Sequence, residues 1–240
     1  MKVIICENYE ELSRTACGIM LETVKGNPYA VLGLATGTTP VKLYELMVKD
    51  HIENGTSYKN ISAVNLDEYC GLDGENEQSY RYFMKKNLFG KIDIDPKNTY
   101  IENGKAADRD KECARYNALL LKLKRDIQLL GLGSNGHIAF NEPETPFDSE
   151  THVVKLTENT VNDNSRLFKD KSEVPRYAFT MGIKNILDAK KILILANGKN
   201  KAEAVLGTVR GKITESLPAS ILQTHPDCTL ICDREAASLL

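Results

Sequence analysis

The sequence predicts an α/β protein with an open, mostly parallel, twisted sheet and helices on both of its faces. Two observations predict this class. Short apolar runs alternate with longer segments of helical pattern along the whole chain, which is typical of parallel strands joined by crossover helices. Three of the runs, AVLGLA (30–35), ISAVNL (61–66) and IQLLGL (127–132), are almost continuously apolar, as central strands covered on both sides must be.

The other elements follow from the same two patterns. Apolar runs bounded by polar residues predict further strands at 2–6, 98–101, 152–156, 191–196 and 229–233. Helical periodicity predicts helices near 8–25, 40–53, 77–88, 106–124, 160–168 and 199–209, with a short one at 234–240. Pro40 suits the first position of the second helix, with Thr39 as its N-cap. Since no repeat or linker interrupts the pattern, we expect one domain, residues 1–240, in which the irregular stretch 144–175 forms either a lid or a surface excursion.

The composition excludes several classes of partner. Charged residues make up 27% of the chain and the net charge is −2, which offers no basic surface for nucleic acid or anionic lipid. No run approaches the ~20 apolar residues of a membrane span, and the N-terminal residues do not resemble a signal peptide, so we expect a cytoplasmic protein. The six cysteines contain no CxxC pair, which favours free thiols over a metal site.

The run LLGLGSNGHIAFNEP (129–143) is the most informative part of the sequence. An apolar strand pattern ends in a glycine-rich turn that carries His137 and, shortly after it, Glu142. Residues that follow a parallel strand lie at the carboxyl edge of the sheet, where α/β proteins bind ligands. Imidazole titrates near neutral pH, so these two side chains are a candidate acid–base pair, to which Gly133 and Gly136 allow close backbone approach.

Two further loops are expected at the same edge. Thr36, Gly37, Thr38 and Thr39 precede a helix, where hydroxyl and backbone N–H groups form a candidate phosphate cradle; a plain capped turn is the simpler interpretation of this loop alone. Asp67 directly follows the strand at 61–66. Alone it would be a solvated turn residue, but in a crevice its carboxylate would have the raised pKa of a useful base.

Two cations complete the candidate site. Lys201 lies in the first turn of a predicted helix, where it opposes the helix dipole unless an anion binds nearby, although Lys199 is equally well placed by this argument. Arg166 lies in the irregular stretch.

Taken in order, these residues resemble the glucosamine-6-phosphate deaminase (glucosamine-6-phosphate isomerase) family. The resemblance extends from Val3 to Asp233 and rests on LGLATGTTP (32–40), NLDEYCGL (65–72), QSYRYFM (78–84), GLGSNGHIAFNEP (131–143), NSRLF (164–168), VPRYAFTMGI (174–183) and NGKNKA (197–202). GHIAFNEP is its most specific element. The resemblance implies a Rossmann-like fold whose active site lies at the carboxyl ends of the strands.

The resemblance also implies a reaction. Members of the family convert glucosamine 6-phosphate and water to fructose 6-phosphate and ammonia, without a metal or organic cofactor. By resemblance, His137 and Glu142 open the pyranose ring, and Asp67 moves a proton from C2 to C1. The phosphate is expected to rest on the loop 36–39, Arg166 and Lys201, and Gly136 is a further expected substrate contact.

Two departures from the family pattern carry expectations. Asn135 stands where some members have an aspartate, so we expect it to position the imidazole, with more of the acid–base work falling on Glu142. Residues 150–155 lack the arginine–lysine pair with which some members bind their activator, so we expect no activation by N-acetylglucosamine 6-phosphate.

Three alternatives remain. A galactosamine-6-phosphate deaminase would differ in stereochemistry at C4, which these motifs do not report. A 6-phosphogluconolactonase would lack the AFNEP run with Glu142. A sugar-phosphate sensor without catalysis would need a DNA-binding module, for which this continuous α/β pattern leaves no room. A homo-oligomer is possible on sequence grounds.

Overall fold

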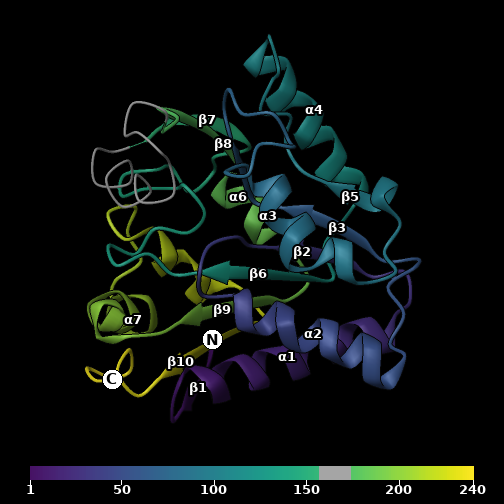
Figure 1. Cartoon of the computed structure of the whole chain (residues 1–240). Coiled ribbons are helices and arrows are strands. Elements are labelled where there is room, and N and C mark those ends of the chain that lie inside the picture. The colour runs from purple at the N-terminus through teal and green to yellow at the C-terminus, as the bar shows by residue number, and fades with distance from the viewer. Residues whose placement is uncertain (157–173) are drawn as a thin grey trace.

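The computed structural model describes residues 1–156 and 174–240, which build a large parallel sheet and a smaller antiparallel one (Figure 1). The large sheet has seven strands in the order β1-β10-β9-β6-β2-β3-β5, all parallel. Its strands are β1 (Lys2–Cys6), β2 (Val31–Leu34), β3 (Ser62–Asn65), β5 (Thr99–Tyr100), β6 (Ile127–Gly131), β9 (Ile192–Ala196) and β10 (Cys228–Asp233). The three runs predicted as central strands, β2, β3 and β6, each have a neighbour on both sides, which confirms their predicted central position.

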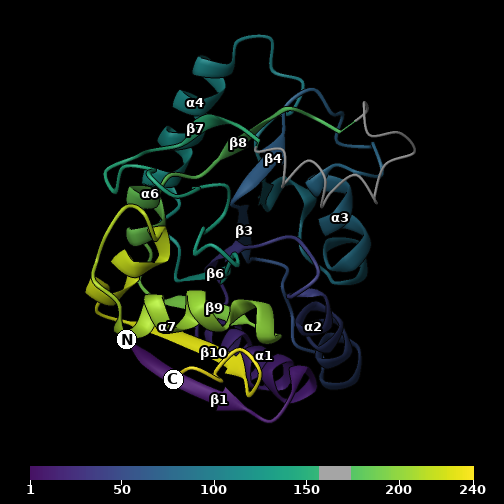
Figure 2. The same cartoon turned by 90° about the vertical axis from the view of Figure 1, so that its left-hand side faces the viewer.

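The second sheet was not expected from the sequence. It contains β4 (Asp67–Tyr69), β8 (Tyr177–Thr180) and β7 (His152–Lys155), with β8 antiparallel to both of its neighbours. The run 152–156, predicted as one more strand of the main sheet, therefore belongs elsewhere. The short strands β4 and β8 were missed because β4 is the polar triplet DEY, whose extended form depends on pairing with β8 and not on hydropathy. Figure 2 shows this sheet at the end of the molecule opposite β1, near helix α4 (Arg109–Lys122).

The helices occupy the predicted positions with small shifts of their ends. They are α1 (Tyr9–Gly26), α2 (Val41–Asn54), α3 (Tyr80–Asn87), α4 and α7 (Ala202–Arg210), together with the short α6 (Ile183–Leu187), which was not predicted. Side chains cap the first, third and fourth of these: those of Asn8, Ser79 and Asp108 accept hydrogen bonds from backbone N–H groups of the first turn. The 3₁₀ turns are η1 (Phe89–Lys91), η2 (Pro96–Asn98), η4 (Lys199–Lys201) and η5 (Pro218–Thr224).

Four local predictions are corrected or left open. Pro40, not Thr39, is the N-cap of α2, and the Thr39 hydroxyl donates to Asn197 Oδ1 instead (3.2 Å). The tail 234–240 forms turns, since seven residues are too few to nucleate a helix without a partner. The predicted helix at 160–168 lies outside the described residues, as does most of the predicted lid; of that stretch, β7 is part of the second sheet.

The core lies between the large sheet and its helices. All five residues of β9 and all six of β10 are buried, and α1 packs against both α2 and these strands. Both chain ends lie near β1 and β10 (Figure 1). Within the described chain, no helix combines the length and the apolar character needed to cross a membrane.

Candidate active site

A cavity of about 870 Å³ opens at the carboxyl edge of the large sheet. The loops after four adjacent strands, β9, β6, β2 and β3, lead into it. Seven of the predicted site residues line this cavity: Thr36, Gly37, Thr38, Thr39, Asp67, His137 and Lys201. The three loops expected at one edge are therefore brought together.

A side-chain amide links the two members of the predicted acid–base pair. Asn135 Nδ2 donates to Glu142 Oε2 (2.7 Å), and Asn135 Oδ1 lies 2.6 Å from His137 Nδ1. Because a carboxylate only accepts, the amide nitrogen must face Glu142 and the amide oxygen must face the imidazole. The imidazole then carries its proton on Nδ1, and Nε2 is left as the basic nitrogen. The direct separation of His137 Nδ1 from Glu142 Oε2 is 3.8 Å, so the amide is the principal link.

The turn that presents His137 depends on glycine at two positions. A Cβ at Gly133 would lie 2.3 Å from the imidazole Nδ1, so any side chain there would displace the ring. Gly136 has φ +83°, a left-handed conformation that favours glycine. Ala139 adopts φ 53° without being a glycine, and the buried Asn141 amide holds the turn by donating to the carbonyls of Ile138 and Met181.

The surroundings of His137 favour a neutral ring. Partial burial is the main cause that lowers its pKa; Lys201 lowers the pKa further, whereas Glu142 opposes the shift. A neutral imidazole with a free Nε2 is able to accept a proton at neutral pH.

Asp67 and Glu68 are adjacent buried carboxylates in opposite environments. Asp67 is 6% exposed, and its Oδ1 has no hydrogen-bond partner among the described residues. Burial, followed by the charge of Glu68, raises the pKa of Asp67 to about 8. Glu68 accepts hydrogen bonds from three backbone N–H groups, those of Tyr69 (2.8 Å), Tyr80 (3.0 Å) and Arg81 (3.0 Å).

An aromatic cluster walls the cavity beside Asp67. The rings of Tyr69 and Tyr80 have centroids 4.8 Å apart, and Phe140 stacks on Tyr80 at 6.2 Å. These side chains line the same cavity as the buried Asp67 carboxylate. Sequence reasoning did not select them, or Glu68, because the relation between the DEY strand and the start of α3 is a tertiary contact. The QSYRYFM match was the one signal in the sequence that pointed to Tyr80.

The loop 36–39, the candidate phosphate cradle, is held in place by contacts with residues far from it in the sequence. Gly37 has φ +91°, and the carbonyl of Thr39 accepts a hydrogen bond from the Tyr9 hydroxyl (2.9 Å). Lys201 lines the cavity from η4, whereas Lys199 is not among its described lining residues, which separates the two rivals. Arg166 lies outside the described residues.

The turn before Lys201 is fixed by the end of β10. Gly198 N donates to both carboxylate oxygens of Asp233 (3.1 and 2.9 Å), and that carboxylate also accepts from Ala236 N (2.8 Å). In the described chain, no three His, Cys, Asp or Glu side chains are grouped as metal ligands would be.

Comparison with known proteins extends over the whole chain. The family model for glucosamine-6-phosphate isomerases/6-phosphogluconolactonase matches residues 7–231. A glucosamine-6-phosphate deaminase of Bacillus velezensis is 50% identical over 238 residues, which cover 99% of each protein. One from Thermoanaerobacter pseudethanolicus is 48% identical over 241 residues, covering 100% of this chain and 95% of the relative.

Solved structures show the same relationship. The structure of a monomeric glucosamine-6-phosphate deaminase of the NagB superfamily matches with a TM-score of 0.97 and 50% identity, with both chains covered completely. The 6-phosphogluconolactonase of Trypanosoma cruzi matches with a TM-score of 0.81 but only 21% identity, covering 100% of this chain and 96% of the other, so this likeness concerns the fold alone.

Gly133→Ala is expected to displace the imidazole of His137, because its Cβ would overlap the ring. The measurement is ¹⁵N NMR of the His137 side chain, in which the variant should lose the hydrogen-bonded Nδ1–H signal of the parent. Gly131→Ala is the matched control, since a Cβ there would meet nothing within 4 Å. Equal His137 spectra in the parent and Gly133→Ala would contradict the proposed packing.

Asp67→Asn is expected to change how stability depends on pH. The pKa of Asp67 is about 8 in the folded protein but about 3.9 in an unfolded chain. Between these values the folded state retains a proton that the unfolded state has released, so the free energy of unfolding falls as pH rises from about 4 to about 8. The variant should lack this fall, which is at most about 1.4 kcal/mol per pH unit.

Urea unfolding at several pH values measures this difference. The exposed Asp110→Asn is the control and should follow the parent curve. A constant difference between Asp67→Asn and the parent over this pH range would show that burial does not raise the pKa of Asp67.

Proposed function

The chain belongs to the glucosamine-6-phosphate isomerase/6-phosphogluconolactonase family, and we propose that it is a glucosamine-6-phosphate deaminase. Its reaction is the conversion of glucosamine 6-phosphate and water to fructose 6-phosphate and ammonia. The observation that carries this assignment is one cavity lined by a desolvated base (Asp67), by His137 and by a threonine-glycine loop with Lys201 for an anion. Glu142 is not among the described lining residues but is linked to His137 through the Asn135 amide.

Ring opening is assigned to the His137 pair. The C1 hydroxyl must lose a proton and the ring oxygen must gain one. Nε2 of His137 is the basic nitrogen, because Asn135 accepts the Nδ1–H. The imidazole takes the proton of the C1 hydroxyl and delivers it to the ring oxygen, and Glu142, held by the Asn135 amide, stabilises the imidazolium that forms in between.

Proton transfer between carbons is assigned to Asp67. Its carboxylate takes the proton from C2 of the open sugar and returns it to C1, while a proton passes from the amine nitrogen to the C1 oxygen, which leaves an imine at C2 and a hydroxyl at C1. Water then adds at C2 and ammonia leaves, so that atoms balance. A carboxylate whose pKa is about 8 is a stronger base than a solvated one, which suits the weak acidity of a C–H bond next to a carbonyl.

The phosphate is assigned to the loop 36–39 at the start of α2. Threonine hydroxyls, the positive helix end and the Lys201 ammonium supply the donors that a dianion needs. The Tyr9 and Asn197 contacts hold this loop in one conformation before substrate arrives. Gly136 and Arg166 remain predicted contacts.

Two rival reactions are less well supported. Three structural relatives described as 6-phosphogluconolactonases are 20–23% identical, which speaks only to the fold, whereas curated relatives at 46–50% identity are described as deaminases. Galactosamine 6-phosphate differs only at C4, and no described contact distinguishes the two sugars.

The direct assay follows ammonia and fructose 6-phosphate from glucosamine 6-phosphate, with galactosamine 6-phosphate and 6-phosphogluconolactone in parallel. Asp67→Asn is expected to lower kcat by about 10²–10⁴, the range for loss of a general base, while substrate binding persists. Asp110→Asn should retain the parent rate, since it is exposed on α4. Turnover of neither amino sugar would overturn the proposal.

We also expect no activation by N-acetylglucosamine 6-phosphate. Residues 150–155 lack the expected cationic pair, and Glu150 already forms an ion pair with Lys184 (2.7 Å). The solved relative of 50% identity is described as monomeric, which supports a chain that works without an activator site between subunits. Initial rates with and without that compound should give the same half-saturation; a several-fold fall would contradict this expectation.

A further inference from the structure

A second cavity, of about 340 Å³, lies on the other side of α3 from the first. The two cavities have no lining residue in common: α3 contributes Tyr80 and Phe83 to the first, and Arg81 and Met84 to the second. The remaining wall of the second cavity is mainly apolar and comes from η1, β5 and the loops beside them. Its volume lies within the range of small-molecule sites, roughly 300–1,000 Å³.

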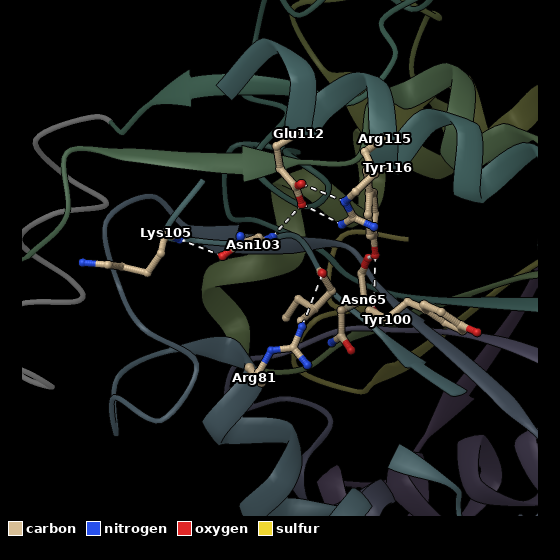
Figure 3. A network of polar contacts seen from close by, with 9 residues as sticks. Asn65, Arg81, Tyr100, Asn103, Lys105, Glu112, Arg115 and Tyr116 are labelled. Atoms are coloured by element: carbon tan, nitrogen blue, oxygen red, sulfur yellow. Dashed lines mark hydrogen bonds and ion pairs between the residues drawn. The ribbon is translucent and has the colours of Figure 1, made fainter. Parts of the chain in front are cut away.

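Asn65 forms part of this cavity and has an unsatisfied side chain. It is 1% exposed, and both its Oδ1 and its Nδ2 lack a hydrogen-bond partner among the described residues. Its backbone is fixed, since the carbonyl accepts from the buried Tyr116 hydroxyl (2.6 Å; Figure 3). Buried amides are normally paired, so an amide with an open donor and an open acceptor beside a cavity calls for a partner there.

Arg81 supplies a charged group at the same place. Figure 3 shows the Arg81 and Asn65 side chains pointing toward one another from α3 and the end of β3. Within the described chain, the guanidinium makes one long hydrogen bond, to the Ile101 carbonyl (3.5 Å), so most of its donors remain available. Gly74 lets the Arg81 stem lie close, because a Cβ there would be 2.4 Å from Arg81 Cδ.

We propose that the second cavity binds a small planar nitrogen heterocycle that presents an amide-like donor–acceptor edge, the chemistry of nucleobases and pyridine carboxamides. An asparagine amide pairs with such an edge through one donated and one accepted hydrogen bond. A guanidinium stacks on a flat ring or donates to its ring acceptors. Met84, Phe89 and Ile94 supply the apolar walls for the faces of the ring.

The second cavity is coupled to the first by two short links. Asn65 precedes Asp67 by two residues, so a ligand bound to the Asn65 amide would act on the same short backbone segment that carries Asp67. The backbone N–H of Arg81 donates to Glu68 Oε2 (3.0 Å), and Glu68 is the charge that contributes to the raised pKa of Asp67. Ligand binding in the second cavity is therefore expected to change the environment of Asp67 in the first.

The test is an NMR titration of ¹⁵N-labelled full-length protein with adenine, uracil and nicotinamide, each alone. Saturable shifts of the Asn65 side-chain amide and Arg81 Nε–H signals are expected, with Kd on the order of 0.1–1 mM. Shifts limited to adenine and uracil would identify nucleobases, and shifts limited to nicotinamide would identify pyridine carboxamides. Benzoate, which lacks a donor edge, and cyclohexanol, which lacks a planar ring, are the controls.

Two variants locate the binding. Asn65→Leu and Arg81→Met should each weaken it by about tenfold or more, whereas Arg14→Met, the same change on the exposed face of α1, should leave it unchanged. If Asn65→Leu fails to fold, Arg81→Met still tests the proposal, because Arg81 is exposed. No saturable shift with any probe, equal binding of benzoate, or shifts at His137 in place of Asn65 would overturn the proposal. Because the readout is binding, failure of the proposed deaminase activity would leave this test intact.

Discussion

Parallel pairing of β9, β6, β2 and β3 is the constraint on which the candidate site depends. Parallel strands end at one edge, so the residues that follow four consecutive members of the sheet must meet. At that edge lie the turn with Lys201, the turn with His137, the loop 36–39 and the Asp67 carboxylate, which come from segments far apart in the sequence. The rest of the structure adjusts this arrangement: Asp233 holds the Gly198 turn, Tyr9 holds Thr39, and Asn141 holds the histidine turn.

A second determinant of the candidate site is that the neighbouring carboxylates of Asp67 and Glu68 have different surroundings. Glu68 receives three backbone N–H groups, which favour its charged form and oppose the effect of burial on its pKa. Among the described residues none donates to Asp67 Oδ1, and burial destabilises its charged form. Glu68 therefore ties β4 to α3, and Asp67 is the carboxylate proposed as the base. The alternation of the strand places them on opposite sides of the same short β4.

The sequence predicted the fold class and the loops that meet at the cavity, but not the second sheet. Strong hydropathy placed β2, β3, β6, β9 and β10 and so located the loops at their ends. The antiparallel sheet escaped prediction because β4 and β8 are short, and because the pairing of Asp67 with Thr180 joins residues more than 100 positions apart. The same holds for Glu68 and the aromatic wall: their role comes from contact with α3, which no local pattern encodes.

Asn135 shows how a departure from a family pattern can be understood from geometry. An aspartate in its place would face Glu142 across 2.7 Å with no hydrogen between them, and two carboxylates at that distance repel or must share a proton. An amide avoids this conflict because it donates to Glu142 and accepts from His137 at once. What it gives up is direct stabilisation of an imidazolium by an adjacent negative charge. In the proposed mechanism, Glu142, 3.8 Å from Nδ1, is then the carboxylate that supplies that charge, and Asn135 orients the imidazole.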